Sequence, residues 1–501
     1  MTPALLLIIT ILGAPPQTEP LDRALEQFQA GAAGSYESII KFGEAAIPGL
    51  TKVLENRALT SQQRFMAANA LGEIGETAAV EPLIRALADS DFNVRRCAAS
   101  ALAMTGDPRA VKPLEELAAK DPFTYKNTKT GELEYLVRDD AKKALASLSR
   151  AEIFLTDATK LPARTVLAGT GPPFQHLPWP FAGNFRDQNA FNNYQQPTDA
   201  YIHGGLDMLH PAGTEVRAVE AGEVALIATN YPDWKTHHFF IVVPKGKSGE
   251  GWCYTHVDPD QYQFKTGDRI ARGQVLGKLV KFTVGGKPGA DHLHLNYVRF
   301  EKGADGKVVM ESLFDPIQYF DYDDKISPVV EPEFDFVKKG TFDEFPRGAD
   351  AIPIISGKAD IIVGISDAAY SGQSCNWGVP VITVEILSEK SKPWRKLVID
   401  QRGKLGDERA ASALFVKFED SKRYPPSAAA AGVVHYYKIT HARGDGLLDA
   451  SDARRYWNTL QKDEFNKPRF PNGLYEITVR AWDAKGNKGE RTARVRVQNK
   501  E

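Results

Sequence analysis

The stretch Asp291-His-Leu-His-Leu-Asn-Tyr-Val-Arg-Phe300 decides the fold of the middle of the chain. Its alternation of polar and apolar residues predicts a β-strand, in which residues i and i+2 share one face. His292 and His294 then point to one side, while Leu293 and Leu295 point into a core. Two imidazoles on a strand face backed by apolar side chains are a common metal-site arrangement, and two exposed strand histidines are the equally simple alternative.

The sequence around this stretch is also β-prone. Glycine and proline residues punctuate short apolar runs, as in an antiparallel domain with tight turns. The runs are Glu215–Val219, Glu223–Ala228, Phe239–Val243 and Leu293–Phe300. We therefore expect an antiparallel β domain over residues 163–320.

A second motif is Tyr201-Ile-His-Gly-Gly-Leu-Asp207. Gly204 and Gly205 argue against a helix and for a bend that enters a strand. Such a bend lets the His203 imidazole and the Asp207 carboxylate converge on one ion, and zinc accepts both ligand types. By itself the motif is weak, since a surface histidine near an aspartate is common.

A third motif, Trp252-Cys-Tyr-Thr-His-Val257, delivers His256 from another β-like run, where a lone histidine is more often structural. The three motifs gain weight together, because eight of the ten histidines lie between His176 and His294. A catalytic zinc needs three protein ligands and one open position, and peptide hydrolysis needs a base and an oxyanion donor as well. The three motifs contain five such groups.

The order of these motifs resembles the lysostaphin-type (LytM-type) zinc endopeptidase family, from about Phe181 to Phe320. The resemblance rests on the three histidine motifs and on the glycine-marked strands between them. It implies one zinc ion per chain, with the metal ligands His203, Asp207 and His294. It also implies that His256 and His292 are the catalytic histidines. We assign His292 as general base and His256 as stabiliser of the oxyanion, and the two roles could be exchanged.

The function implied by the resemblance is zinc-dependent endopeptidase activity on peptides of bacterial cell-wall peptidoglycan. All five residues are present, which favours an active enzyme. One alternative is a non-catalytic protein that binds peptidoglycan or regulates a hydrolase. Another is a peptidase that acts on Gly-rich protein substrates.

Two segments depart from the family pattern. Trp179 to Tyr201 is long and aromatic, so it either covers the groove or packs against the domain. Tyr231 to His238 is an unusual loop. We interpret four further histidines as surface or supporting residues: His176, His210, His237 and His238.

An internal repeat marks the N-terminal part. Ala67-Ala-Asn-Ala-Leu-Gly-Glu-Ile-Gly75 recurs 31 residues later as Ala98-Ala-Ser-Ala-Leu-Ala-Met-Thr-Gly106. Each copy predicts a small-residue helix, a glycine turn and a second helix, and neither helix can bury its apolar face alone. Residues 20–150 thus resemble HEAT-type repeats in an α-solenoid. Such a stack is either a binding surface for a protein partner or a structural cap.

The C-terminal part changes pattern again. Residues 321–345 are acidic and contain proline, which indicates a linker. Residues 346–501 alternate in short runs and end in a hairpin around the turn Asp483–Asn487. They resemble an immunoglobulin-like or fibronectin-like β-sandwich, a spacer or binding module whose fold alone does not define a function.

Composition excludes some functions. A net charge of −2 gives no electrostatic reason to bind nucleic acid. The apolar run Ala4–Leu12 is too short to span a bilayer and has the length of a signal-peptide core. We therefore expect a signal peptide at 1–18 and an exported protein, either periplasmic or extracellular and associated with the cell wall. No later segment is apolar enough for a membrane span. Cys97, Cys253 and Cys375 lie too far apart for a cysteine-rich module, although one disulfide pair stays open.

Overall fold

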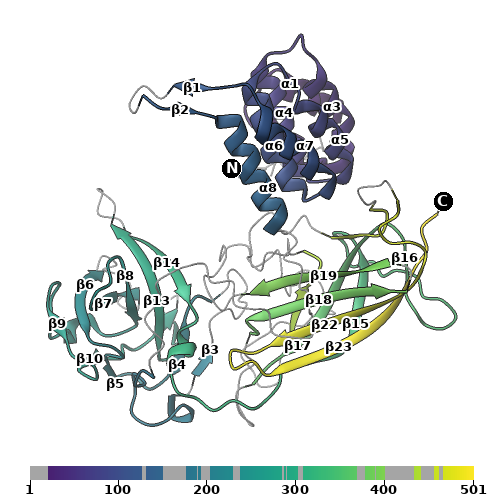
Figure 1. The fold of residues 1–501 in the computed structure, drawn as a ribbon. Helices are drawn as coiled ribbons and strands as arrows, with labels where there is room; N and C mark the ends of the chain where they lie inside the picture. Colours follow the sequence, from purple (N-terminus) through teal and green to yellow (C-terminus); the bar gives the residue numbers. More distant parts are fainter. Residues whose placement is uncertain are drawn as a thin grey trace, which may run out of the picture. The chain divides into compact units, whose positions relative to one another are not determined.

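The computed structural model divides the chain into two compact units, residues 1–148 and 149–501 (Figure 1). We treat each unit by itself. The structure describes residues 21–126, 131–150, 176–188, 190–192, 203–228, 237–284, 287–288, 290–302, 308–368, 378–389, 391–400, 434–441, 456–461 and 467–500.

The first unit is helical. Its helices are α1 (Leu21–Gln29), α2 (Ser35–Lys41), α3 (Ile47–Glu55), α4 (Ser61–Ile74), α5 (Val80–Ala86), α6 (Phe92–Thr105), α7 (Val111–Lys120) and α8 (Leu136–Arg150), with the short strands β1 (Tyr125–Lys126) and β2 (Leu133–Glu134) before α8. The two repeat copies form the pairs α4–α5 and α6–α7. Gly75 and Gly106 end the first helix of each pair with φ of 68° and 66°, a left-handed conformation that favours glycine. The predicted helical repeats are confirmed.

Buried ion pairs also follow the repeat. The Arg64 guanidinium donates to both carboxylate oxygens of Asp89 at 3.0 Å. One repeat later, Arg95 does the same to Asp121 at 2.6 and 3.1 Å. Both arginines also donate to nearby backbone carbonyls, so these buried charges are paired and hydrogen-bonded. The sequence analysis missed these pairs because each arginine lies about 25 residues from its aspartate.

The helices of neighbouring repeats approach closely at Gly72. A Cβ atom at this position would lie 2.6 Å from the Ala101 Cβ atom and 2.7 Å from its Cα atom. Gly72 lies on α4 and Ala101 on α6, and both are buried. The absence of a side chain at Gly72 therefore sets how closely these two helices pack.

The second unit begins with an antiparallel eight-stranded sheet. Its order is β3 (Ala190–Asn192), β4 (Leu206–Leu209), β13 (His292–Lys302), β8 (Glu250–Thr255), β7 (Phe239–Pro244), β6 (Gly222–Ala228) and β9 (Arg269–Ile270), and β14 (Val308–Phe314) also pairs with β13. Two smaller pairs are β5 (Glu215–Arg217) with β10 (Val275–Lys278), and β11 (Thr283–Val284) with β12 (Lys287–Pro288). All four predicted runs coincide with strands, which confirms an antiparallel β-rich region here.

The aromatic side chains before this sheet belong to its core. Phe181 and Phe185 are buried in the same hydrophobic cluster as Leu293 and Leu295, and Trp179 packs against it. These three residues therefore pack against the domain, which was one of the two possibilities for this segment. The side chains of Phe191 and Tyr194, and residues 231–236 of the second unusual segment, lie outside the described residues.

Two further sheets follow toward the C-terminus. One contains β15 (Val329–Lys338), β17 (Lys358–Ser366), β20 (His435–Lys438) and β21 (Trp457–Asn458). The other has the order β16 (Ile354–Ile355), β23 (Lys488–Val497), β22 (Gly473–Trp482), β18 (Val381–Ser388) and β19 (Ser391–Asp400). Buried side chains from both sheets belong to one hydrophobic cluster, and β22 and β23 form the predicted hairpin. The immunoglobulin-like assignment stays a prediction.

The linker predicted for residues 321–345 is wrong over its middle. Strand β15 occupies ten of these residues and pairs with β17. Its side chains Val330, Phe334 and Phe336 are buried in the shared core. Of the residues that suggested a linker, Pro332 lies at a break in the strand register between Val330 and Phe334. The others, Asp321, Asp323, Asp324 and Pro328, precede the strand.

Two expectations from composition can be compared with the structure. Cys97 and Cys253 are free cysteines, and burial raises the pKa of the Cys253 thiol to about 12. Cys375 and the apolar run at Ala4–Leu12 lie outside the described residues. Within the described part of the chain, no helix is long and apolar enough to cross a membrane.

Buried carboxyl groups gather where the segment after the first sheet meets the β22–β23 turn. The Asn487 side chain donates to the Asp324 carbonyl at 3.1 Å, and Lys485 Nζ lies 4.0 Å from the centre of the Tyr322 ring. Burial raises the pKa of Asp324 to about 7, and the charge of Asp483 adds to this shift. The pKa of Asp483 is itself raised by burial.

Replacing Gly72 by alanine is expected to destabilise the helical unit. Overpacking costs about 1–3 kcal/mol, which outweighs the gain of about 1 kcal/mol from alanine's higher helix propensity. Denaturant unfolding of the full chain, followed by helical circular dichroism, measures the change. Ser100→Ala on the exposed face of α6 is the control and should leave the unfolding free energy nearly unchanged. Equal or greater stability of Gly72→Ala would contradict the close contact with Ala101.

Asp324 should make the second unit less stable as pH rises. Its pKa is about 7 in the folded chain against the ordinary 3.8. Between these two pH values the Asp324 carboxyl is ionised in the unfolded chain but protonated in the folded chain. Stability contributed by the protonated group is therefore lost as pH rises toward about 7. We expect Asp324→Asn to flatten the change in melting temperature between about pH 5 and pH 8.

The neighbouring Asp323 offers a matched control for this experiment. Its side chain is 79% exposed and pairs with Lys325 at the surface. Asp323→Asn should keep the pH dependence of the wild type. If both variants behave alike, Asp324 is not the group responsible.

Candidate metal centre

The pairing register of β13 brings two of the predicted ligands together. His294 lies directly opposite Asp207 of β4 on one side and opposite Thr255 of β8 on the other. The neighbouring positions Leu293 and Leu295 are fully buried, as expected from the alternation. The register therefore places the His294 side chain on the same face of the sheet as the Asp207 carboxylate.

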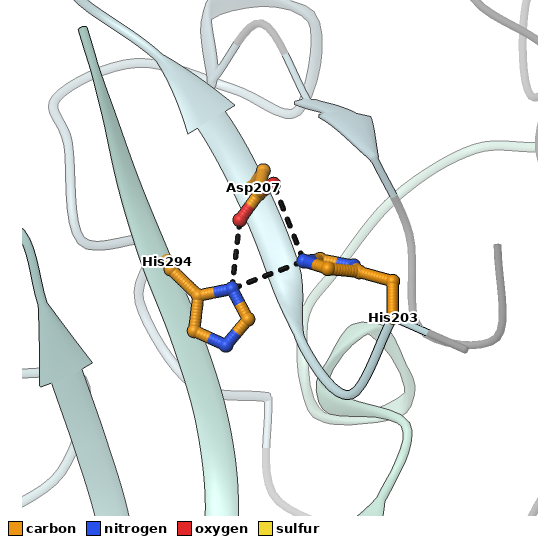
Figure 2. Close-up of side chains that lie close together, drawn as sticks. All are labelled: His203, Asp207 and His294. Atoms are coloured by element: carbon orange, nitrogen blue, oxygen red, sulfur yellow. Dashed lines mark hydrogen bonds and ion pairs between the residues drawn. The ribbon is translucent and has the colours of Figure 1, made fainter. Parts of the chain in front are cut away.

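The third predicted ligand reaches the same point from the bend before β4. Figure 2 shows the imidazoles of His203 and His294 and the carboxylate of Asp207 facing one another. His203 Nε2 lies 3.2 Å from Asp207 Oδ2 and 3.0 Å from His294 Nδ1, while His294 Nδ1 lies 2.8 Å from Asp207 Oδ1. The predicted bend brings the imidazole onto the carboxylate four residues later.

Gly205 leaves room for the His294 ring beside this bend. A Cβ atom at Gly205 would lie 2.7 Å from both Cε1 and Nε2 of His294, and 2.9 Å from the Leu295 carbonyl oxygen. A residue with a side chain cannot occupy this position unless the His294 ring or strand β13 moves. The absent side chain thus leaves room for a ligand ring.

The protonation states suit a cation. Burial alone would raise the pKa of Asp207, but the charge of His203 and the hydrogen bonds from His203 and His294 hold it well below its usual value. Burial lowers the pKa of His294, and the hydrogen bond with Asp207 opposes this only in part. A carboxylate and a neutral imidazole are the forms that bind a metal ion.

The donor set and its spacing fit a tetrahedral ion. Among the described residues, His203, Asp207 and His294 form a group whose ligand atoms all lie within 4.8 Å of one another. Zinc bonds of 2.0–2.1 Å to nitrogen place neighbouring ligand atoms about 3.3 Å apart in a tetrahedron. The separations of 2.8–3.2 Å are close to this value. These three residues can therefore hold a metal ion and leave its fourth position open.

The two predicted catalytic histidines lie beside this group. The ring centres of His256 and His292 are 4.5 Å apart, and the His256 ring is 6.4 Å from that of His294. His292 Nε2 lies 3.8 Å from Asp207 Oδ1, so this nitrogen is directed toward the metal-binding group. All five predicted site residues are thus brought together.

The hydrogen bonding of His292 assigns its tautomer. Its Nδ1 lies 2.7 Å from the Ala290 carbonyl oxygen, which can only accept a hydrogen bond. Nδ1 therefore carries the proton in the neutral ring, and Nε2 is left with a lone pair. The nitrogen nearest the metal-binding group is the one that can accept a proton.

His256 occupies an unusual backbone conformation. It is one of two non-glycine residues in the described chain with positive φ, at 70°. It follows directly after β8, and its backbone N–H donates to the His238 carbonyl at 3.3 Å. Left-handed backbone at such a residue is sparsely populated and is concentrated at functional sites.

The four other histidines of this region divide into two kinds. His176 is exposed and pairs with Asp321, and His210 packs on the Phe181 ring. His237 makes an edge contact with the His256 ring, while His238 supports His256 through its carbonyl. The interpretation as surface or supporting residues is consistent with these positions.

Comparison with known proteins agrees with this geometry. Residues 201–307 match the family model described as peptidase family M23, and residues 47–128 match the model of HEAT repeats. The central β region is an M23 peptidase domain. The M23 match spans all five site residues.

Solved structures give further likenesses. A protein assigned to peptidase M23 from Pseudomonas aeruginosa is 27% identical, over 26% of this chain and 47% of its own, with a TM-score of 0.18. The catalytic domain of lysostaphin from Staphylococcus simulans is 20% identical, over 23% and 82%, with a TM-score of 0.19. A zinc-containing peptidase from Vibrio cholerae is 17% identical, over 27% and 39%, with a TM-score of 0.17. The chain thus matches less than half of the Pseudomonas protein, and a comparison with curated proteins found no match.

Replacing Gly205 by alanine is expected to abolish metal binding by the M23 domain. The new methyl group would overlap the His294 ring and displace it from Asp207. Bound zinc, measured by mass spectrometry of purified protein, should fall from about one per chain to near zero. Gly213→Ala is the control: Gly213 has a positive φ of 90°, unlike Gly205, and no atom lies within 4 Å of its would-be Cβ. Gly213→Ala should lose about 1–2 kcal/mol of stability and keep its zinc. Full zinc content in Gly205→Ala would contradict the assigned contact.

Proposed function

We propose that the M23 domain is an active zinc endopeptidase that hydrolyses peptide bonds of bacterial cell-wall peptidoglycan. The observation that carries this proposal is the convergence of His203, Asp207 and His294 with the two histidines His256 and His292. A structural zinc site would need only a closed set of ligands. Two further imidazoles beside a three-ligand group supply what hydrolysis requires in addition.

The three ligands would hold one zinc ion through His203 Nε2, Asp207 and His294 Nδ1. When bound, zinc lowers the pKa of a water molecule and polarises the scissile carbonyl. The burial of His203 and Asp207, at 3% and 4% exposure, keeps competing solvent away from these ligands. It also strengthens the electrostatic interaction of the ligands with a cation.

His292 is the better candidate for the general base. Its Nδ1 proton is held by the Ala290 carbonyl, so Nε2 carries the lone pair that can take the proton of the attacking water. The same nitrogen faces the Asp207 carboxylate at 3.8 Å.

His256 would then stabilise the tetrahedral oxyanion and protonate the leaving amine. Its ring lies next to that of His292 but farther from the ligand rings. A cationic or hydrogen-bond-donating imidazole placed there acts where negative charge develops. The exchange of roles between His256 and His292 is the alternative, and the tautomer of His292 argues against it.

The cell-wall substrate is the most specific part of the proposal. It is supported by the resemblance of the motifs to lysostaphin-type enzymes and by the expected export of the chain. The lysostaphin of Staphylococcus simulans is described as an antimicrobial peptidase. The competing functions, a non-catalytic wall-binding protein and a peptidase for Gly-rich proteins, make different predictions for the same digestion.

Substituting a ligand and substituting a catalytic histidine should have different effects. His294→Ala is expected to lose both zinc and hydrolysis of purified cell walls. His292→Ala should keep about one zinc per chain while the rate falls by about 10²–10⁴-fold, because only the base is removed. The exposed His176→Ala is the control and should retain both properties. Zinc content equal to wild type in His294→Ala would refute the ligand assignment.

Mass spectrometry of muropeptides after digestion identifies which peptide bond is cleaved. New amino termini within wall peptides are expected with the wild type and should be absent in a chelator-treated sample. Cleavage of Gly-rich peptides but not of wall fragments would favour the protein substrate. No cleavage of either, with zinc bound, would favour the non-catalytic role.

A further inference from the structure

Phe282 is an aromatic residue in the site that neither the motifs nor the proposed mechanism involves. It lies after β10, and its ring is half-buried. The ring centre is 4.8 Å from that of His256 and 4.7 Å from that of His292, with interplanar angles of 73° and 64°. The two histidine rings are 4.5 Å from each other. The three rings therefore form a closed triangle of edge-on contacts.

The backbone around Phe282 is held at two points of the site. The Val280 N–H donates to the His256 carbonyl at 3.0 Å. The Phe282 N–H donates to Asp291 Oδ1 at 2.9 Å, which fixes it beside the residue that precedes His292. One end of this short segment is thus hydrogen-bonded to His256, and the other end to the residue before His292.

Asp291 joins three segments through one carboxylate. Besides the Phe282 N–H, it accepts a hydrogen bond from the Ala212 N–H at 3.1 Å and from Lys281 Nζ at 2.9 Å. Bonds to an ionised acceptor are stronger than neutral ones. The Phe282 ring is therefore held by the chain around it and not only by its own packing.

This arrangement matters because the two imidazoles need a defined orientation. His256 has a left-handed backbone conformation, and Nδ1 of His292 donates to the Ala290 carbonyl. The last torsion of a histidine side chain is broad, so ring packing contributes to fixing the orientation of an imidazole. A ring packed against both imidazoles restricts the rotation of each.

We propose that Phe282 is a positioning residue: its ring fixes the His256 and His292 imidazoles side by side, and Asp291 holds Phe282 in place through its backbone. This inference rests on the proposed catalytic function of the two histidines. It predicts that Phe282 affects the chemical step and leaves metal binding unchanged, because the ring contacts the catalytic histidines.

The test compares Phe282→Ala and Phe282→Tyr with the wild type, all as zinc-loaded full-length chains. Phe264→Ala is the matched control, since Phe264 packs in the same domain on Phe240 and Tyr262. Nuclear magnetic resonance of histidine ring protons is the first measurement. Phe282→Ala should shift the signals of His256 and His292 and leave those of His203 and His294, and the zinc content, in place. Phe264→Ala should leave all four unchanged.

Kinetics on wall fragments is the second measurement. Phe282→Ala is expected to lower kcat by about 10–100-fold with KM nearly constant, since small displacements of catalytic groups have effects of this size. Phe282→Tyr, which keeps the ring, should restore most of kcat. Unchanged His256 and His292 signals in Phe282→Ala, or an unchanged kcat, would overturn the proposal. An inactive wild type would refute the proposed function, and the resonance measurement, which needs no turnover, would still decide whether Phe282 positions the two rings.

Discussion

The site depends on the antiparallel register of β13. This strand is paired on both sides, so His294 lies opposite Asp207 on β4 and opposite Thr255 on β8 at the same time. A shift by one residue would turn His292 and His294 into the core and expose the buried leucines between them. Two hydrogen-bonded ladders and one apolar face therefore fix a geometry that three ligand side chains could not maintain alone.

The two functions of the site come from different parts of the sheet. The metal-binding group joins β13 to the bend before β4, where Gly205 leaves room for the His294 ring. The catalytic histidines join the start of β13 to the end of β8, where His256 has positive φ. β13 carries one metal ligand, His294, and one proposed catalytic histidine, His292, so the strand pairing that positions the ligand positions the proposed base as well.

The flanking regions are built on their own cores. The helical repeats form one hydrophobic cluster with buried Arg–Asp pairs, and the C-terminal sheets share another. The M23 domain has a separate cluster that contains the aromatic residues before β3. The site residues thus depend on the packing of one domain, and a helical stack or a pair of sheets is compatible with many functions.

The sequence by itself determined the local features of this protein. The alternation in Asp291–Phe300, the glycine bend before Asp207 and the 31-residue repeat are each encoded by neighbouring residues, so the strands, the helical repeats and all five candidate site residues could be predicted. Only the tertiary structure decided the tautomer of His292, the backbone of His256 and the contact of Phe282 with both. It also showed β15 where composition indicated a linker. These features depend on contacts between residues far apart in the chain. The spacing of polar and apolar residues within one segment carries no information about such contacts.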